Sequence, residues 1–442
     1  MKAGERLGDR FDLEQPIGTG GMGTVFRARD PISGETVAVK VISDGQSHRT
    51  ERFAREVKVL AELSHPGIVR HISHGVTSSG ELFLAMEWVD GEVLKTRLQR
   101  GPLTVSEAVT LATRVAEALG DAHDHGIVHR DLKPSNLILP GGRIDQVKVL
   151  DFGIAQREGK TQLTKTGTML GSPGYMAPEQ ARSGGQIDAR ADVFALGCVL
   201  FECLTGVPPF DGDTAAAILA KILFGTAPRV SELWPGVPES LDALVAQRLA
   251  KEPALRPSDG ANLAAALAAL GPLVHTTAMR ESAARLRATT GGERRLLAAV
   301  MLGPTAHDDS LIEDSLRRAV APYGGRLEQL ADGSAIVVLD PDHQAATDQA
   351  AQAARCALAM YALAGHRHLA IAMGHTESGA RLPEGDVIDR ASRLLAQIDL
   401  RPADLPPIAL DEVSAGLLDA TAKPAGSCTG TPWASWQRPP AS

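Results

Sequence analysis

A stretch of eight residues decides the fold: His129-Arg130-Asp131-Leu132-Lys133-Pro134-Ser135-Asn136. A shorter stretch, Asp151-Phe152-Gly153, follows it along the chain. An isolated Asp or Asn in such a loop is usually a turn residue or a helix cap. Here an acid, an amine and an amide fall within residues 131–136, and a second acid follows at Asp151. Which function these residues indicate depends on the motifs that precede them in the sequence.

A glycine-rich run lies near the N-terminus: Ile17-Gly18-Thr19-Gly20-Gly21-Met22-Gly23-Thr24-Val25. Glycines at 18, 20 and 23 let the backbone approach phosphate oxygens because no Cβ stands in the way. The same spacing occurs in dinucleotide-binding folds, where the last glycine opens a helix, and in hairpins that are merely flexible. Residues 24–28 continue here as another strand. This order favours a phosphate-binding hairpin over a dinucleotide fold.

The next strand carries a lysine, in Val37-Ala38-Val39-Lys40. A lone lysine on a strand is usually solvated, but this one can point back beneath the glycine-rich run. Glu56 lies in an amphipathic helical segment, residues 50–63, one turn before an apolar position that faces inward. Because an unpaired inward carboxylate is costly, we predict an ion pair between Lys40 and Glu56.

These motifs, in this order and spacing, match the signature set of protein kinases. Residues 11–270 resemble the eukaryotic-like serine/threonine protein kinases of bacteria. The resemblance implies an α+β, bilobal kinase fold with a β-rich N-lobe and a helical C-lobe. It also implies ATP with Mg²⁺ or Mn²⁺ as cofactors, protein substrates, and transfer of the γ-phosphate to Ser or Thr hydroxyls (EC 2.7.11.1 type) in bacterial signal transduction.

In addition to the predicted ion pair of Lys40 and Glu56, the resemblance implies a role for each polar residue of the other motifs. Asp131 would accept or orient the proton of the substrate hydroxyl, and Lys133 would steady the γ-phosphate. Asn136 and Asp151 would hold the metal. Such groups suit phosphoryl transfer, since its catalysis is mostly positioning and charge neutralisation. A lysine at position 133 is typical of serine/threonine kinases rather than tyrosine kinases.

The same resemblance implies an ATP site made of backbone and apolar side chains. Its members are Ile17, Gly18, Thr19, Gly20, Gly21, Met22, Gly23, Thr24, Val25, Ala38, Lys40, Met86, Glu87, Val89 and Ile138. Met86 would be the gatekeeper, and Glu87 and Val89 would offer backbone hydrogen bonds along the hinge. For the apolar members, core packing and ligand contact are not exclusive, so both interpretations remain open.

Two further contacts are implied in the helical lobe. Glu179 and Arg256 would form a buried ion pair, and Asp192 would bond the backbone around His129 and Arg130. Neither contact is catalytic.

Arg130 implies control by phosphorylation, because its charge would need an anionic partner from the activation segment. A phosphate adds a charge of about −1.5 to −2 and can order such a segment. The predicted autophosphorylation sites are Thr164, Thr166 and Thr168. A polar, threonine-rich loop without modification is the alternative.

The remainder of the chain predicts a second domain at residues 293–413, separated by a linker at 271–292. Strand-like and helical segments alternate there, which indicates an α/β sandwich. Three stretches resemble the class III nucleotide-cyclase homology domain: residues 292–300, 323–333 and 385–394. A tail at 414–442, rich in Gly, Pro, Ser, Thr and Ala, is expected to be poorly ordered.

This second domain departs from the cyclase pattern at its metal site. Asp332 could be one metal ligand, but Leu302-Gly303-Pro304 stands where the other aspartate is expected. Asp389 replaces the usual asparagine, while Arg393 remains. A single carboxylate is a poor two-metal site. We therefore expect a catalytically silent module for regulation or dimerisation, with a degenerate ATPase-like or purely structural domain as the alternative.

Composition narrows the location and the partners. The net charge of −8 argues against a general nucleic-acid binder. The first residues have no apolar core of a signal peptide, and no run reaches the roughly 18 apolar residues of a membrane span. The four cysteines do not have zinc-site spacing. We expect a cytoplasmic protein without a membrane anchor in this chain, and a homodimer through the second domain stays open.

Two other functions compete with an active kinase. A pseudokinase scaffold would lack one of four residues that are all present: Lys40, Asp131, Asn136 and Asp151. A nucleotide cyclase with a kinase-like regulator would need the metal aspartate that is absent near Gly303.

Overall fold

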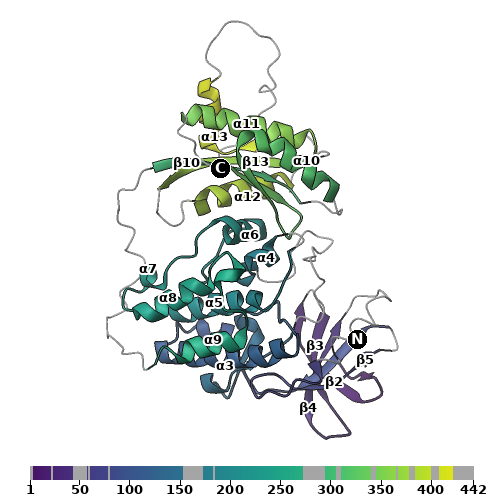
Figure 1. Cartoon of the computed structure of the whole chain (residues 1–442). Coiled ribbons are helices and arrows are strands. Elements are labelled where there is room, and N and C mark those ends of the chain that lie inside the picture. The colour runs from purple at the N-terminus through teal and green to yellow at the C-terminus, as the bar shows by residue number, and fades with distance from the viewer. Residues whose placement is uncertain are drawn as a thin grey trace.

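The structure is a computed structural model, and it describes the following parts of the chain: residues 3–20, 23–42, 57, 60–77, 80–152, 173–182, 185–271, 294–304, 310–339, 345–364, 367–377, 384–399 and 408–421. Within these ranges the chain forms a β-rich N-terminal lobe, a helical lobe and a separate C-terminal domain (Figure 1).

The N-terminal lobe is a six-stranded antiparallel sheet in the order β1-β2-β3-β4-β6-β5. Its strands are β1 (Arg6–Leu7), β2 (Phe11–Gly20), β3 (Gly23–Arg29), β4 (Thr36–Ile42), β5 (His71–Val76) and β6 (Leu82–Glu87). In β4, the valines at 37, 39 and 41 are buried on one face. The period of two then directs Ala38 and Lys40 to the opposite face.

The helical lobe begins with a small sheet of β7 (Gly91–Val93), β8 (Leu137–Pro140) and β9 (Lys148–Val149). Its helices are α2 (Leu94–Leu98), α3 (Val105–Asp124), α4 (Pro178–Ala181), α5 (Arg190–Thr205), α6 (Ala215–Phe224), α7 (Val230–Leu233), α8 (Glu239–Arg248) and α9 (Gly260–Ala268). Four 3-10 turns complete it: η1 (Pro134–Asn136), η2 (Ile144–Gln146), η3 (Pro173–Tyr175) and η4 (Pro253–Leu255).

The long helices of this lobe have clear sequence causes. Thr104 caps α3, since its hydroxyl accepts from the Glu107 N–H while the Glu107 carboxylate accepts from the Thr104 N–H. Helix α5 is buried on nearly all of its sides and forms the centre of the lobe. It ends at Gly206, whose φ of 84° suits a glycine at a helix C-terminus.

The C-terminal domain, residues 294–421, is a five-stranded sheet in the order β11-β12-β10-β13-β14. The strands are β10 (Arg294–Leu302), β11 (Gly325–Gln329), β12 (Ala335–Leu339), β13 (Leu369–Glu377) and β14 (Ile408–Leu410). The helices are α10 (Ser310–Val320), α11 (Ala346–Tyr361), α12 (Glu384–Asp399) and α13 (Glu412–Thr421), with a 3-10 turn η5 (Ala321–Tyr323). Only β13 and β14 pair in parallel among the described strands.

The central strand of this sheet, β10, is buried on both faces. Ala298, Val300 and Leu302 belong to the core that includes residues of α10, α11 and α13. Ala299 and Met301, on the other face, belong to the cluster that also contains the core of the helical lobe. In Figure 1, α12 lies on this second face of the sheet, next to α6 of the helical lobe. This face of the sheet, with α12, therefore shares one apolar core with the helical lobe.

One helix runs past a predicted domain boundary. Helix α13 continues the described chain to Thr421, beyond the boundary predicted at residue 413, and buries Ala415 and Leu418. Residues 422–442 and the connection at 272–293 lie outside the described residues. Of the helix predicted at 50–63, the structure describes Val57 and the residues from 60 onward.

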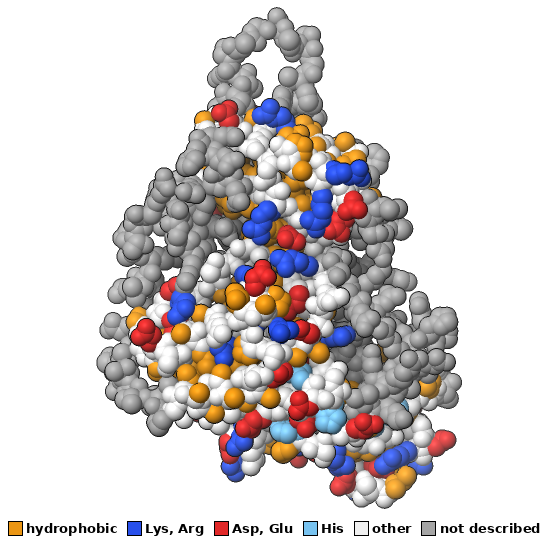
Figure 2. All heavy atoms as spheres, viewed as in Figure 1, with side chains coloured by type: hydrophobic (Ala, Val, Ile, Leu, Met, Phe, Trp, Pro, Cys, Tyr) orange, Lys and Arg blue, Asp and Glu red, His pale blue; other side chains and the backbone are white. Residues whose placement is uncertain are grey.

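The surface is mixed in charge on the face drawn in Figure 2. Basic and acidic side chains lie intermixed where the C-terminal domain meets the helical lobe (Figure 2). No described helix combines the length and the apolar composition needed to cross a bilayer.

Candidate active site

The stretch at 129–136 forms a compact polar cluster around Asp131. The ammonium of Lys133 donates to both carboxylate oxygens of Asp131, at 2.8 and 3.0 Å. The amide nitrogen of Asn136 donates to the Asp131 carbonyl oxygen at 2.8 Å and to its carboxylate at 3.2 Å. The Oδ1 of this amide carries its lone pairs and is the atom that can bind a cation. The local turn, η1, thus brings an acid, an amine and an amide together.

A buried aspartate on α5 holds the backbone of this cluster. Asp192 is fully buried and accepts from the N–H groups of His129 at 2.7 Å and Arg130 at 2.8 Å. This contact was predicted from the sequence and is confirmed. His123 on α3 contacts the same carboxylate at 2.9 Å. A carboxylate with several N–H partners is well compensated for its burial.

Two hydrogen bonds bring Asp151 to the cluster. A ring nitrogen of His129 lies 2.9 Å from the carbonyl oxygen of Leu150. The N–H of Leu150 donates to the carbonyl of Asn136 at 2.8 Å. Asp151, the next residue, has a φ of 51°, and Arg130 has a φ of 65°. Each such conformation in a non-glycine residue costs about 1–3 kcal/mol, so the surrounding contacts must hold it.

Lys40 reaches across from the N-terminal lobe. Its ammonium lies 3.0 Å from a carboxylate oxygen of Asp151. In the sheet, Lys40 pairs with Val25 of β3 and Leu84 of β6, which places it on the central strands of the lobe. Glu56, the partner predicted from the sequence, lies outside the described residues. Among the described residues, the acidic partner of Lys40 is therefore Asp151.

The glycine-rich run is the hairpin of β2 and β3. Its last described pair is Gly20 opposite Gly23. Gly23 has a φ of 136°, and a Cβ there would lie 1.9 Å from the Val41 carbonyl oxygen, so no other residue fits. Ile17 is about half exposed at the entrance to the hairpin. Gly21 and Met22, between the strands, lie outside the described residues.

The strand pairing also brings the remaining ATP-site candidates near this hairpin. Ala38 pairs with Met86 across β4 and β6, and Met86 is buried. The N–H of Glu87 donates to the Arg70 carbonyl at 2.9 Å, and its carboxylate accepts from Lys148 at 2.5 Å. A nucleotide contact at Glu87 would therefore use its carbonyl oxygen.

The other members of the predicted ATP site occupy neighbouring strand positions. Gly18 pairs with Val25, and Thr19 pairs with Thr24 in the hairpin. Val89, which follows β6, and Ile138 of β8 are half-buried. The predicted phosphorylation sites are Thr164, Thr166 and Thr168, and they lie outside the described residues.

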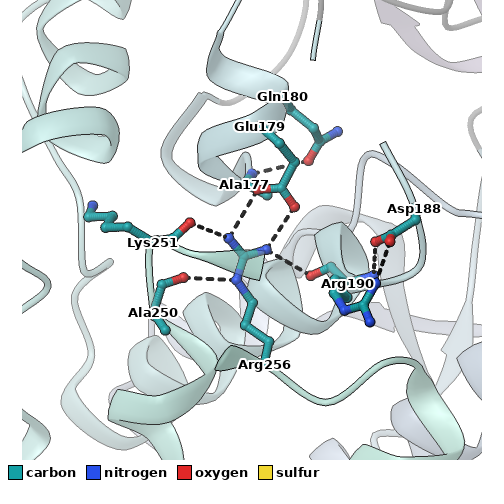
Figure 3. Close-up of polar contacts among 8 residues, drawn as sticks. All are labelled: Ala177, Glu179, Gln180, Asp188, Arg190, Ala250, Lys251 and Arg256. Carbon is teal, nitrogen blue, oxygen red and sulfur yellow. Dashed lines mark hydrogen bonds and ion pairs between the residues drawn. The ribbon is translucent and has the colours of Figure 1, made fainter. Parts of the chain in front are cut away.

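A buried ion pair supports the cluster from the side of α4. Arg256 donates to the two oxygens of Glu179 at 2.7 and 3.0 Å, as predicted from the sequence (Figure 3). The same guanidinium donates to the carbonyl oxygens of Arg190, Ala250 and Lys251. Every side of this buried cation is thus compensated.

Sequence reasoning missed the adjacent residue, Gln180. Its amide nitrogen donates to the Arg130 carbonyl at 2.8 Å, and its oxygen accepts from the Ala177 N–H at 3.1 Å. Both backbone groups of Arg130 are therefore held, one by Asp192 and one by Gln180. The only signal was a position next to Glu179, and a glutamine there has no distinctive chemistry in the sequence.

A tyrosine anchors the turn that precedes α4. The hydroxyl of Tyr175 in η3 donates to Glu202 of α5 at 2.7 Å. Burial raises the pKa of the Tyr175 phenol and also that of the Glu202 carboxyl. The phenol stays protonated at neutral pH and keeps its role as donor.

The donor set suits a hard cation. Asn136 and Asp151 offer amide and carboxylate oxygens, the ligands that Mg²⁺ takes together with substrate phosphates. Among the described residues, no group of three or more His, Cys, Asp or Glu side chains could hold a metal alone. This holds for the C-terminal domain too, where Asp332 is buried and bonds to Ser334.

Comparison with known proteins identifies the family. The family model described as "Protein kinase domain" matches residues 11–268, more than half of the chain. The chain belongs to the protein kinase family, and its N-terminal and helical lobes are the two lobes of the kinase domain.

Bacterial relatives are similar over the same length of chain. A probable serine/threonine-protein kinase PknB of Lactococcus lactis is 41% identical over 261 residues, which is 57% of this chain and 40% of the relative. Serine/threonine-protein kinase PknH of Mycobacterium tuberculosis is 40% identical over 268 residues, 59% of this chain and 42% of the relative. Serine/threonine-protein kinase pkn3 of Myxococcus xanthus is 38% identical over 279 residues, which is 60% of this chain and 51% of the relative. The chain spans about half or less of the length of these curated relatives.

Proposed function

We propose that this chain is an active serine/threonine protein kinase, which transfers the γ-phosphate of ATP to Ser or Thr hydroxyls of proteins. One observation carries the proposal. Lys40 from one lobe meets Asp151 from the other, next to the loop in which Lys133 and Asn136 bond Asp131. The relatives named above are serine/threonine kinases, which supports the substrate class.

In the proposed mechanism, Asp131 orients the substrate hydroxyl and takes up its proton as the oxygen attacks the γ-phosphorus, while the bond to the β–γ bridging oxygen breaks and ADP leaves. The Lys133 ammonium, already 2.8 Å from this carboxylate, balances charge on the transferred phosphoryl group. Lys40 holds the phosphates of the nucleotide. Asn136 Oδ1 and the Asp151 carboxylate would hold Mg²⁺, which when bound neutralises the phosphate oxygens.

The proposed nucleotide site follows the hairpin and the hinge. Gly18, Gly20 and Gly23 admit the phosphates to the backbone, while Ala38 and Met86 line the base. The Glu87 carbonyl and the Val89 backbone supply its hydrogen bonds. The close approach of Gly23 to the backbone of β4 supports a hairpin that folds tightly over its neighbour.

We also propose control by phosphorylation of the activation segment at Thr164, Thr166 or Thr168. The support comes from Arg130. Its Nε is buried and has no hydrogen-bond partner among the described residues. A guanidinium with an unpartnered buried nitrogen favours an anionic partner, and a phosphate can form paired hydrogen bonds with such a group. Mass spectrometry of the purified protein tests this site assignment directly.

The test of the kinase activity uses labelled ATP, Mg²⁺ and a generic Ser/Thr-containing protein substrate. The unsubstituted chain is compared with Asp131→Asn, which keeps the shape but removes the proton acceptor. Asp124→Asn, at the exposed end of α3, is the matched control. If the unsubstituted chain transfers phosphate no faster than Asp131→Asn does, the chain is a scaffold without kinase activity.

For the C-terminal domain we propose a catalytically silent, cyclase-like module. A specific observation supports it: the two residues expected in cyclase chemistry face the kinase domain. Asp389 pairs with Lys221 at 2.7 Å, and Arg393 pairs with Asp213 at 2.9 Å. Cyclic nucleotide production by the full chain would contradict this proposal. Homodimerisation through this domain stays a prediction, which light scattering tests.

A further inference from the structure

The C-terminal domain packs against the helical lobe through α12 and the β11–β12 end of its sheet. Helix α12 lies along α6 (Figure 1). Val387, Ala391 and Leu395 of α12 belong to the same buried apolar cluster as Ala220 and Leu223 of α6. An apolar contact of this kind between the two parts of the chain is a packed interface and not a chance approach of surface side chains.

Polar contacts select this arrangement. The ammonium of Lys221, only 9% exposed, lies 2.7 Å from Asp389 of α12 and donates to the Asp211 carbonyl at 2.6 Å. Because a buried lysine without an anion is unfavourable, this pair depends on the C-terminal domain remaining in place. The guanidinium of Arg326 in β11 stacks over the Phe224 ring at 5.1 Å.

The second contact is made with the end of α4. Arg182, which follows this helix, forms an antiparallel bridge with Leu330. The N–H of Ala331 donates to the Ala181 carbonyl at 2.9 Å, and Arg182 pairs with Glu328 at 3.3 Å. The C-terminal domain thus supplies a strand-like partner for the backbone that leaves α4.

Helix α4 is a single turn, and such a helix is not stable without packing. It packs against α6, and three hydrogen-bonded contacts tie it to other parts of the chain. Glu179 bonds Arg256 within the helical lobe (Figure 3), and Ala181 bonds Ala331 of the C-terminal domain. The third is Gln180, which donates to the Arg130 carbonyl one residue before Asp131. The position of α4 is therefore linked to the backbone of the catalytic loop.

We propose that the C-terminal domain is an intramolecular positioning element for phosphoryl transfer. By holding Ala181, it fixes α4, and through Gln180 it stabilises the left-handed conformation of Arg130 beside Asp131. This inference rests on the proposed kinase activity. Among the described residues, the hydrogen bonds and ion pairs of this contact do not include the hairpin of β2 and β3. Release of the domain therefore lowers kcat and leaves ATP binding unchanged.

The test uses the full chain with single substitutions at the interface. Asp389→Lys sets two ammonium groups against each other at Lys221, and Glu328→Arg sets two guanidinium groups together at Arg182. The double variant Arg182→Glu with Glu328→Arg restores an opposite pair. Asp314→Lys makes the same charge change at an exposed position of α10 and is the matched control.

Two measurements are made on each variant. Hydrogen exchange at residues 177–182 reports whether α4 is held, and steady-state kinetics gives kcat and the KM for ATP. We expect faster exchange and a kcat lowered about 3- to 30-fold for Asp389→Lys and Glu328→Arg, as typical coupling free energies predict. The KM for ATP stays unchanged. The double variant recovers kcat, a result that general destabilisation of the fold would not produce.

Two outcomes overturn the inference. One is faster exchange in Asp389→Lys with kcat unchanged or raised, since α4 would then be released without effect on catalysis. The other is unchanged exchange, which would show that this interface does not hold α4. If the unsubstituted chain transfers no phosphate, the proposed kinase activity fails separately, and exchange still reports whether the domain holds the helix.

Discussion

The ammonium of Lys40 lies 3.0 Å from a carboxylate oxygen of Asp151. Lys40 belongs to β4 of the N-terminal lobe, whereas Asp151 follows β9 in the helical lobe. The pair joins the lobes where the proposed phosphates and metal would lie. Because a phosphate competes for the same ammonium, we expect ATP to move Lys40 toward the nucleotide and to free Asp151 for the metal.

Replacing Lys40 by methionine tests this relationship. Lys40→Met keeps the apolar stem and removes the charge. We expect kcat to fall about 10²- to 10³-fold, the order of the loss when one preorganised donor is removed from an oxyanion hole. Steady-state kinetics with Mg²⁺ and ATP measures it. The control is Lys95→Met on the exposed side of α2, and equal rates in the two variants would contradict the role of Lys40.

The buried pair of Glu179 and Arg256 predicts a large effect on stability. Glu179→Gln keeps the size of the side chain and leaves the Arg256 charge without its anion. We expect the free energy of unfolding of the kinase domain to fall by about 3–5 kcal/mol. Urea unfolding at neutral pH measures the change.

A neighbouring exposed pair provides the comparison. Arg190 and Asp188 lie 2.6 Å apart beside the buried pair (Figure 3), but Asp188 is mostly exposed. Asp188→Asn should cost about 0–1 kcal/mol. Equal costs at the two sites would show that the burial of Glu179 has no energetic weight.

Asp30 makes the N-terminal lobe sensitive to acid. Hydrogen bonding to Arg10 is the main cause that lowers its pKa from 3.8 to about 2, with further bonds from Ile32 and Ser33. A lowered pKa in the folded state stabilises the fold above the unfolded pKa, and the effect is lost as pH falls from about 4 to about 2. Its full contribution is about 2 kcal/mol.

The measurement is the unfolding free energy of the unsubstituted chain and of Asp30→Asn at several pH values between 2 and 7. The difference between them should be largest at neutral pH and should shrink below pH 4. A difference that is constant across this range would exclude Asp30 as the titrating group.

Asp332 predicts the opposite dependence in the C-terminal domain. Burial raises the pKa of this carboxyl, although Ser334 donates to it through its hydroxyl and its N–H. A raised pKa in the folded state makes the domain more stable when Asp332 is protonated, and stability decreases as pH rises above 3.8 through the folded pKa. Asp332→Asn keeps the acceptor oxygen without the charge, and should stabilise the domain at pH 7.

Hydrogen exchange of the β12 amides, next to Asp332, measures the stability of this domain. Exchange should be slower in Asp332→Asn than in the unsubstituted chain, while Asp314→Asn on the exposed side of α10 should have no effect. Faster exchange in Asp332→Asn would mean that the charge itself is required, as in a metal site.

Local patterns predicted much of the fold. The strand-like run Val37-Ala38-Val39-Lys40 predicted β4, and the alternation of strand-like and helical segments over 293–413 predicted the α/β character of the C-terminal domain. Strand β5, His71–Val76, was missed because its alternating side chains are polar and partly exposed. The short strands β7 to β9 are too brief for any period to register.

The residues of the site were predicted from the sequence, but most of the contacts between distant segments were not. Motif spacing identified Asp131, Lys133, Asn136 and Asp151, because each motif is local in sequence. The contact of Lys40 with Asp151, however, depends on how two lobes close, and no local pattern encodes that geometry. For the same reason the pairing of Lys221 with Asp389 was unforeseen, since both are ordinary surface residue types on helices of different domains.

The apolar cluster shared by α6, α12 and the sheet of the C-terminal domain has a practical consequence for expression. A fragment cut after α9 would bare the α6 surface, and a fragment begun at β10 would bare α12 and one sheet face. Newly exposed apolar patches of this kind promote self-association. Aggregation or altered activity of either fragment would then result from the newly exposed surface and would not be a property of the full chain. The chain is therefore best purified whole.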